Sequence, residues 1–468
     1  MTEAPEEKTF RDAISTVDDR GKRVWIYPKK PSGRFYNYRI WSSYALLAVL
    51  FSGPFIRIGG EPLLLLNILE RKFVILGQVF WPQDSHLFVL AMITTVVFII
   101  LFTVVYGRLF CGWVCPQTIF MEMVFRRIEY WIEGDANHQK KLNRSPWNAE
   151  KIRKKGLKHA IFFVLSFLIA NTFLAYIIGS EALIAIITDP PGEHVAGLMG
   201  ITVFSGVFYG VFAGLREQVC TTICPYGRLQ GVLLDRDSVV IAYDHVRGEN
   251  RSKFRKNEDR AAEGKGDCID CNACVAVCPT GIDIRNGTQL ECVNCTACID
   301  ACDDIMDKVG LERGLIRYAS ETQITTGSRF SLTKRSKAYT VVLFVLLTII
   351  TGLTVIRSEV ETSILRTPGM LYQEEADGNY TNLYNYTIVN KTNNDMPIRF
   401  ESLSPIATIQ TVGDSMLVEK QGMVEGVFFV RINGEDLQGT KNKIEIGVYD
   451  GERLIEKVST NFIGPFKQ

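Results

Sequence analysis

The sequence predicts a multi-domain membrane protein in which a bundle of apolar helices carries a cysteine-rich insert and is followed by an all-β domain. Three observations predict this class. Five apolar runs are each about long enough to cross a bilayer, whose hydrocarbon core needs about 20 residues of helix. Eight of the twelve cysteines fall in two copies of one spacing between the fourth and fifth runs. Beyond the fifth run, polar and β-prone residues alternate as they do in strands.

The apolar runs set the expected domain organisation. We expect membrane helices over residues 38–56, 87–106, 160–178, 195–215 and 339–356. The first run contains Pro54 and ends beside Arg57, so its end is the least sharply marked. The resulting segments are an amino-terminal segment (1–37), a four-helix membrane region (38–243), a cysteine-rich domain (244–338), a fifth helix (339–356) and a β domain (357–468).

The distribution of basic residues predicts an orientation, although the formal net charge is only +1. Lysine and arginine number eight in residues 1–37, eleven in 107–158 and eighteen in 216–338, whereas the loops after the first and third runs hold three and none. Positive charge stays on the cytoplasmic side during insertion. We therefore expect a multi-pass protein of the bacterial inner membrane, with the cysteine-rich domain in the cytoplasm and residues 357–468 in the periplasm.

The cysteine-rich domain contains two C-x2-C-x2-C-x3-C motifs. They comprise Cys268, Cys271, Cys274 and Cys278, and Cys292, Cys295, Cys298 and Cys302. This is the bacterial ferredoxin spacing, in which three thiolates bind one [4Fe-4S] cluster and the fourth binds the other. It predicts cluster I on Cys268, Cys271, Cys274 and Cys302, and cluster II on Cys292, Cys295, Cys298 and Cys278. A zinc site would need only two close pairs, and a disulfide framework would not repeat so regularly. Thiolate ligands also suit a reducing compartment, in agreement with the orientation expected from charge.

The other four cysteines form a second repeat beside the membrane. Cys111-x3-Cys115-Pro116 begins five residues after the second run, and Cys220-x3-Cys224-Pro225 begins five residues after the fourth. Two such hairpins indicate an internal duplication. Residues four apart share one helix face, so each pair presents two thiols together, and the following proline favours a helix boundary beside them. If the two hairpins pack together, the four thiols meet at one site, where they are candidate redox or copper thiols. A copper site, a further iron–sulfur centre and an exchangeable thiol pair all fit this pattern, as do four small buried hydrophobes.

Several other functions are disfavoured by the sequence. Of the five histidines, no two lie within the apolar runs in an arrangement suited to the paired axial ligands of a membrane haem. The basic residues Lys334, Arg335 and Lys337 directly precede the fifth run, where they are expected to fix topology. We therefore expect no nucleic-acid partner.

The last 112 residues, 357–468, read as short strands joined by tight turns. Alternating patterns over 384–389, 423–431, 443–448 and 454–463 predict strands. Asn433-Gly434 and Asp450-Gly451 mark turns between them. About 100 residues of this kind predict an immunoglobulin-like β-sandwich without an inter-sheet disulfide. The expected role is binding or positioning.

Together these features resemble the FixG/RdxA/CcoG family, accessory proteins for cbb3-type cytochrome c oxidase. The similarity covers nearly the whole chain and includes Tyr27-Pro28-Lys29-Lys30 before the first run and Phe80-Trp81-Pro82-Gln83-Asp84 before the second. The resemblance implies a role in oxidase biogenesis through reduction of Cu(II) to Cu(I). It also implies oxidase assembly or copper-delivery proteins as partners.

Three classes of function fit the chain. The first is an oxidoreductase for oxidase assembly. In it, the dicluster ferredoxin-like domain supplies single electrons, and the C-x3-C-P thiols hold copper as the substrate. Cu(I) prefers soft ligands such as these thiols. The second is a membrane electron-transfer subunit that oxidises quinol, similar to NapH-type proteins. The third is a non-catalytic scaffold. The outer β domain favours the first and third. Electron transfer requires a donor, and nothing in the sequence identifies it.

Overall fold

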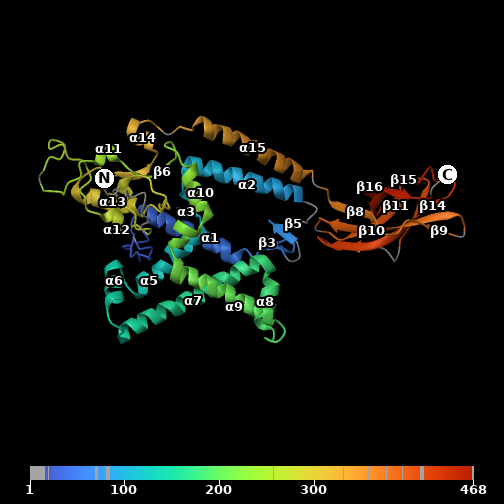
Figure 1. Cartoon of the computed structure of the whole chain (residues 1–468), viewed down its shortest axis with the longest axis horizontal. Helices are drawn as coiled ribbons and strands as arrows, with labels where there is room; N and C mark the ends of the chain where they lie inside the picture. The colour runs from blue at the N-terminus through green and yellow to red at the C-terminus, as the bar shows by residue number, and fades with distance from the viewer. Residues whose placement is uncertain are drawn as a thin grey trace, which may run out of the picture. The chain divides into compact units, whose positions relative to one another are not determined.

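The computed structural model describes residues 16–18, 20–68, 72–80, 85–256, 258–329, 331–356, 358–375, 377–392, 394–411 and 416–465. Figure 1 shows the order of the helices and strands along the chain. The described residues fall into two compact units. The first lies within Met1–Ile56, Pro62–Glu70 and Phe88–Ile349, and the second within Arg57–Glu61, Arg71–Leu87 and Ile350–Gln468.

Among the described residues, four helices are long and apolar enough to cross a membrane. They are α2 (Ser85–Tyr106), α7 (Ala149–Ile178), α9 (Val195–Gly210) with its π-helical continuation η3 (Val211–Leu215), and α15 (Lys334–Val355). None of the most apolar part of α15 is buried inside the protein. A helix that is apolar on every side and uncovered by protein requires a hydrocarbon environment. Four of the five expected spans are thereby confirmed as membrane-type helices.

The first expected span forms a helix, α1 (Arg34–Ser52), that does not belong to this set. Its first half carries Arg34, Asn37 and Arg39, which lower its apolar character. The helix ends two residues before Pro54. A membrane crossing by α1 stays a prediction.

Short helices connect the spans in the first unit. They are α3 (Leu109–Trp113), α4 (Pro116–Thr118), η2 (Ile119–Phe125), α5 (Arg126–Ile132), α6 (Ala136–Arg144), α8 (Ser180–Thr188), η4 (Val219–Ile223) and α10 (Pro225–Leu233). Pro116 and Pro225 occupy the first turns of α4 and α10, where a missing N–H costs nothing. Cys115 and Cys224 are therefore the N-cap residues of these helices. The two motifs thus have the same local structure, which agrees with a duplication.

The cysteine-rich part of the first unit consists of small helices and one two-stranded sheet. These are α11 (His245–Gly248), α12 (Ala273–Ala276), η5 (Ile284–Asn286), α13 (Ala297–Val309), α14 (Glu321–Thr326), and the antiparallel strands β6 (Val240–Tyr243) and β7 (Ile316–Ala319). The carboxylate of Asp300 on α13 accepts hydrogen bonds from the first amides of α1, at 3.1 Å from Phe35 and 2.8 Å from Tyr36. Because these amides have no partner within the helix, α13 caps α1 and fixes the cysteine-rich part against it.

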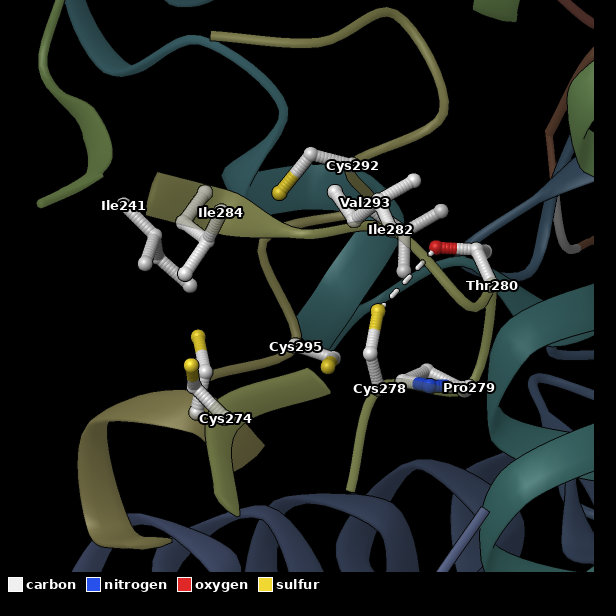
Figure 2. A pocket seen from close by; sticks show the side chains of 11 residues that line it. Ile241, Cys274, Cys278, Pro279, Thr280, Ile282, Ile284, Cys292, Val293 and Cys295 are labelled. Carbon is white, nitrogen blue, oxygen red and sulfur yellow. Dashed lines mark hydrogen bonds between the residues drawn. The ribbon is translucent and has the colours of Figure 1, made fainter. Parts of the chain in front are cut away.

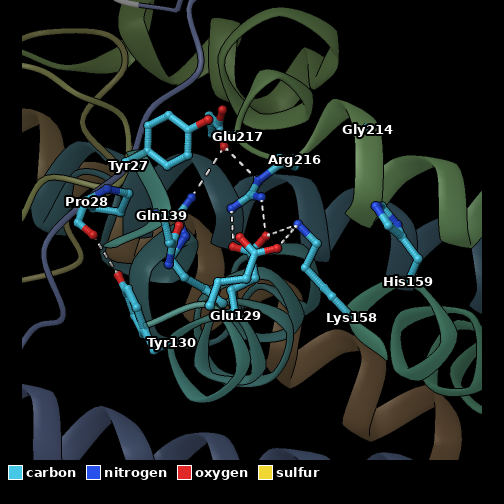
Figure 3. A network of polar contacts seen from close by, with 12 residues as sticks. Tyr27, Pro28, Glu129, Tyr130, Gln139, Lys158, His159, Gly214, Arg216 and Glu217 are labelled. Atoms are coloured by element: carbon cyan, nitrogen blue, oxygen red, sulfur yellow. Dashed lines mark hydrogen bonds and ion pairs between the residues drawn. The ribbon is translucent and has the colours of Figure 1, made fainter. Parts of the chain in front are cut away.

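A buried network of charged side chains joins the two motif hairpins (Figure 3). Arg216 donates to the two carboxylate oxygens of Glu129 at 2.6 and 2.7 Å, and Lys158 Nζ lies 3.5 Å from the same carboxylate. Glu217 pairs with Arg126 at 3.4 Å. Glu129 lies on α5, after the first C-x3-C-P motif, whereas Arg216 and Glu217 directly precede the second. The network therefore holds the two hairpins in one arrangement.

The second unit contains a β-sandwich. One sheet has the order β12–β14–β10–β8 with β9 on β10, and the other has the order β13–β11–β15–β16. The strands are β8 (Val360–Arg366), β9 (Gln373–Glu374), β10 (Asn379–Asn390), β11 (Met396–Ser402), β12 (Ala407–Thr411), β13 (Met416–Val418), β14 (Met423–Asn433), β15 (Lys441–Asp450) and β16 (Arg453–Ile463). Alternate residues such as Tyr384, Phe428 and Ile444 enter the shared core. The four strands expected from alternation are confirmed.

The same unit includes part of the loop between α1 and α2. Strands β4 (Lys72–Ile75) and β5 (Gln78–Phe80) form a hairpin, and Gln421 Nε2 lies 3.5 Å from the carbonyl oxygen of Gly77 at its turn. The other short strands of the loop are β1 (Arg57–Ile58), β2 (Glu61–Pro62) and β3 (Leu64–Asn67). The hairpin and the β-sandwich therefore belong together.

Candidate metal centres

Two cavities lie among the ferredoxin-motif loops. The first cavity is lined by Cys268, Cys271, Cys274 and Cys302, with Tyr243, Arg285 and Met306 among its other residues. The second is lined by Cys278, Cys292, Cys295 and Cys298, and also by Cys274, Ile241 and Ile284 (Figure 2). Each motif therefore places its fourth cysteine at the cavity of the other motif. Because Cys274 lines both, the two cavities are neighbours.

The residues around both cavities fit a [4Fe-4S] cluster. Four thiols around a largely apolar cavity are the donor set that such a cluster takes. The residues on either side of the second cysteine are left-handed in both motifs: Asp270 and Asn272 have φ of 52° and 57°, and Asn294 and Thr296 have φ of 52° and 66°. Left-handed backbone is costly for a β-branched threonine. Both loops thus keep the same strained turn beside their thiols, as functional sites often do.

Arg285 adds positive charge to the first cavity. Its side chain donates to Asp283 at 2.6 Å, Asp270 at 2.6 Å and Asn272 at 2.6 Å. The hydrogen bond to Asp283 is the largest influence on the pKa of Arg285, which is raised above its ordinary value. A permanent cation beside thiolates favours the more negative, reduced state of a cluster, since local charge helps to set its potential. Sequence reasoning missed Arg285, although it lies only seven residues after Cys278.

The first cysteines of the two C-x3-C-P motifs, Cys111 and Cys220, pack on one buried cluster. We call the four C-x3-C-P cysteines the four-thiol site. Cys111 Sγ lies 3.4 Å from Gln230 Oε1 on α10, the helix that follows the second motif. Burial is the largest effect on both thiols and raises the pKa of Cys111 to about 11 and that of Cys220 to about 12. The first motif therefore contacts α10, the helix that follows the second motif.

The four-thiol site lies against the second cavity. Cys111 and Cys220 pack on a buried cluster that includes Val293 and Cys295, two residues that line this cavity. Arg108 donates to the carbonyl oxygens of Leu290 and of Gly227, and lies 3.4 Å from that of Cys292. Arg108 thereby joins the first motif, the second motif and the loop of the second cavity. The order in space is first cavity, second cavity, four-thiol site.

Gly112 permits this close approach. It lies between Cys111 and Cys115, and a Cβ atom there would overlap the carbonyl oxygen of Asn294 and come within 2.7 Å of that of Val293. Backbone carbonyls cannot move aside as a flexible side chain can. Sequence reasoning missed both Gly112 and Arg108. Their position inside or next to the C-x3-C-P motif was the available signal.

Replacing Gly112 by alanine is expected to destabilise the protein by about 1–3 kcal/mol, the usual cost of overpacking a fixed interior. The cost arises where the first motif meets the second cavity, so cluster content should fall with it. Thermal unfolding of detergent-solubilised protein and the visible absorbance of the clusters are the measurements. Gly156→Ala is the control, because a Cβ at that helical position meets no atom within 4 Å, and alanine is the better helix former. Equal stability of the two variants would contradict the contact.

The fold and these centres define a membrane iron–sulfur protein. Family models match three parts of the chain: a 4Fe-4S dicluster domain over residues 215–321, a 4Fe-4S binding domain over 88–137, and an IG-like fold at the C-terminal of FixG over 350–465. Iron–sulfur domains and the immunoglobulin-like sandwich expected from the sequence are thereby confirmed.

Curated relatives show the family. The chain is 34% identical to Protein RdxB of Cereibacter sphaeroides over 79% of its own length and 80% of that protein, and 34% identical to Protein RdxA of the same organism over 81% and 82%. It is 40% identical to Nitrogen fixation protein FixG of Rhizobium meliloti over 64% of its own length, and covers 58% of that protein. A crystal structure of a FixG-related protein from Vibrio parahaemolyticus matches 23% of the chain at 15% identity, with a TM-score of 0.19. The chain belongs to the family of FixG, RdxA and RdxB.

Proposed function

We propose that this protein is an oxidoreductase of the bacterial inner membrane that passes single electrons to Cu(II) and supplies Cu(I) during biogenesis of a cbb3-type cytochrome c oxidase. The observation that carries the proposal is the order of the three sulfur-lined sites. They lead from an exposed cysteine of the first cavity to the partly buried thiols that follow the membrane helices. Its partners would be oxidase assembly or copper-delivery proteins.

The proposed ligand sets follow the two cavities. Cluster I is assigned to Cys268, Cys271, Cys274 and Cys302, and cluster II to Cys292, Cys295, Cys298 and Cys278. Each set surrounds one cavity, which supports the assignment. When bound, these clusters supply one-electron transfer. Cys271 is the exposed member of the first set, so we assign the docking of the electron donor to this side.

The four-thiol site is the proposed exit for the electron. Cys111, Cys115, Cys220 and Cys224 are soft ligands, which favour Cu(I) over Cu(II). The step balances without protons or bond cleavage: each reduced cluster gives one electron, and each Cu(II) takes one and becomes Cu(I). Arg108 and Gly112 hold this site against the second cavity, so both act as positioning residues.

We also propose that α1 is a fifth span, that the clusters are cytoplasmic and that the β-sandwich is periplasmic. The hairpin between α1 and α2 belongs to the same compact unit as the β-sandwich, which supports their lying on one side of the membrane. The ferredoxin motifs and the 107–158 segment belong to the other unit. The basic residues concentrate in that unit's loops, as the positive-inside rule requires.

Fusion reporters are expected to show this topology. An alkaline phosphatase fused after Ile356 should be active, because it folds with its disulfides only after export. The same enzyme inserted after Gly264, an exposed position, should be inactive. A fluorescent protein that matures only in the cytoplasm should give the opposite pattern at the two sites. Activity of the phosphatase at Gly264 would refute the proposed orientation.

Reduction of copper by the purified protein tests the proposed function. Fully loaded protein, reduced anaerobically and freed of reductant, should convert about one Cu(II) per reduced cluster, measured with a Cu(I)-specific chelator. Replacing Cys111 and Cys115 by serine should slow this at least tenfold, because serine removes the soft thiolate. The matched control is Val114→Ser with Ile223→Ser, two exposed positions within the same motifs. If the parent protein oxidises a quinol and ignores Cu(II), the quinol-oxidising alternative is correct.

A further inference from the structure

We propose that residues 251–256 form the docking surface for a small acidic protein that carries single electrons on an iron–sulfur centre. We call these residues the basic segment; their sequence is Arg-Ser-Lys-Phe-Arg-Lys. This inference rests on the proposed function, because it names the class of partner that delivers the electron. One electron leaves the reduced carrier and one enters this protein at the first cavity, and no bond forms or breaks.

The basic segment is attached to the wall of the first cavity. The backbone N–H of Ser252 donates to the carbonyl oxygen of Cys268 at 3.3 Å. The guanidinium of Arg251 lies over the ring of Tyr243, 5.8 Å from its centroid. Cys268 and Tyr243 both line the first cavity, as does the exposed Cys271. The segment and the exposed cysteine therefore lie at the same cavity.

The basic segment carries positive charge that has no acidic partner. Lys253, Arg255 and Lys256 are exposed, and the ion pairs formed by the described residues of 249–270 leave these three side chains out. Of the six acidic residues in the same range, only Asp259 lacks a cation, and its carboxylate accepts the backbone N–H groups of the following turn. The uncompensated charge beside the first motif is therefore positive.

Membrane topology does not account for these cations. The positive-inside rule acts within about 15–20 residues of a span. The basic segment begins 36 residues after η3 ends at Leu215, and it ends 78 residues before α15 begins at Lys334. An anionic lipid surface is also disfavoured, because the second cavity lies between the first cavity and the four-thiol site, which follows the membrane helices.

An acidic carrier protein fits this surface. Complementary charge speeds the encounter of two proteins by as much as about 10³-fold. Phe254 lies between the cations and is 40% exposed, and aromatic side chains are enriched in the apolar centres of protein interfaces. Electron-transfer complexes have small interfaces. A short basic segment with one aromatic side chain, beside an exposed cysteine, suits such an encounter.

Binding of an acidic plant-type [2Fe-2S] ferredoxin to the full chain in nanodiscs of neutral lipid tests this inference. We expect binding that weakens steeply as salt is raised, because the Debye length falls from about 10 Å at 0.1 M to about 3 Å at 1 M. The variant Lys253→Glu/Arg255→Glu/Lys256→Glu should bind ferredoxin at least tenfold more weakly at low salt. Cytochrome c, a basic one-electron carrier, should bind the parent protein at least tenfold more weakly than ferredoxin does.

A second triple variant is the matched control. Lys140→Glu/Lys141→Glu/Arg144→Glu makes the same change of net charge at three exposed cations of α6. It should bind ferredoxin as the parent does. An equal loss of binding in both triple variants would show an effect of net charge alone and overturn the inference.

The remaining outcomes separate the inference from the proposed function. Unchanged ferredoxin binding in the basic-segment variant, tighter binding of cytochrome c, or no ferredoxin binding by the parent would overturn the docking surface. Loss of binding to anionic-lipid vesicles alone would instead assign the segment to a membrane surface. Salt-dependent ferredoxin binding by a parent that, after chemical reduction, leaves Cu(II) unchanged would support the docking surface and refute the proposed function. Reduction of Cu(II) without ferredoxin binding would do the reverse.

Discussion

Replacing Cys278 by serine is expected to remove about four iron atoms and to destroy cluster II, although Cys278 belongs to the first motif. Cys278 lines the second cavity with Cys292, Cys295 and Cys298. Serine does not replace a soft thiolate as a ligand for iron. Since cluster II lies between cluster I and the four-thiol site, reduction of Cu(II) should also fall by at least tenfold. Iron content and the electron paramagnetic resonance spectrum of the reduced protein are the measurements.

The reciprocal variant provides the control for this crossed ligation. Cys302 belongs to the second motif but lines the first cavity. Cys302→Ser should therefore damage cluster I and spare the signal of cluster II. Loss of cluster I in the Cys278 variant, with cluster II intact, would show that each motif binds its own cluster.

The second large effect concerns the buried pair of Glu129 and Arg216. Replacing Glu129 by glutamine is expected to lower the free energy of unfolding by about 3–5 kcal/mol, the cost of leaving a buried charge without its partner. Both side chains are 3% exposed, and Lys158 shares the same carboxylate. Thermal unfolding in detergent measures the loss. Glu150→Gln is the control, because the Glu150–Lys154 pair lies at the surface, where solvent screens the charges and such pairs contribute little to stability. Equal effects of the two changes would contradict the structural role of the network.

The same pair predicts a pH dependence. Burial by itself raises the pKa of Glu129, but Arg216, Lys158 and Arg126 outweigh it and lower the pKa to about 2, from an ordinary value of 4.5. Between these values the unfolded chain binds the proton and the folded chain does not. The stabilisation is therefore complete above about pH 4.5 and is lost as the pH falls toward 2. Glu129→Gln should remove this part of the acid sensitivity.

The local features of the chain were predictable from sequence, because they depend on short-range patterns. The cysteine spacing indicated iron–sulfur binding, and alternation indicated the strands around Tyr386 and Ile446. Apolar length identified four spans. It was less decisive for α1, because its first half carries Arg39. This side chain is 4% exposed and donates to the carbonyl oxygen of Gly112 at 3.0 Å.

The arrangement of the sites was not predictable in the same way. The pairing of Glu129 with Arg216 joins residues 87 positions apart, and no periodicity connects them. The contact of Cys111 with Gln230 spans 119 positions. The left-handed turns at Asn294 and Thr296 depend on how the loop surrounds its cavity. Each of these features arises from the packing of separate hairpins, so only a three-dimensional structure could reveal it.

Rapid mixing of the reduced protein with Cu(II) tests the central claim most directly. The absorbance of the clusters reports their oxidation, and a chelator reports Cu(I) at the same time. We expect the clusters to be reoxidised as Cu(I) appears, with one copper reduced per electron. The reaction should be lost in the quadruple variant, in which the four C-x3-C-P cysteines (Cys111, Cys115, Cys220 and Cys224) are replaced by serine. Reoxidation by a quinone with no response to Cu(II), or an equal rate in the quadruple variant, would contradict the proposed route of the electron.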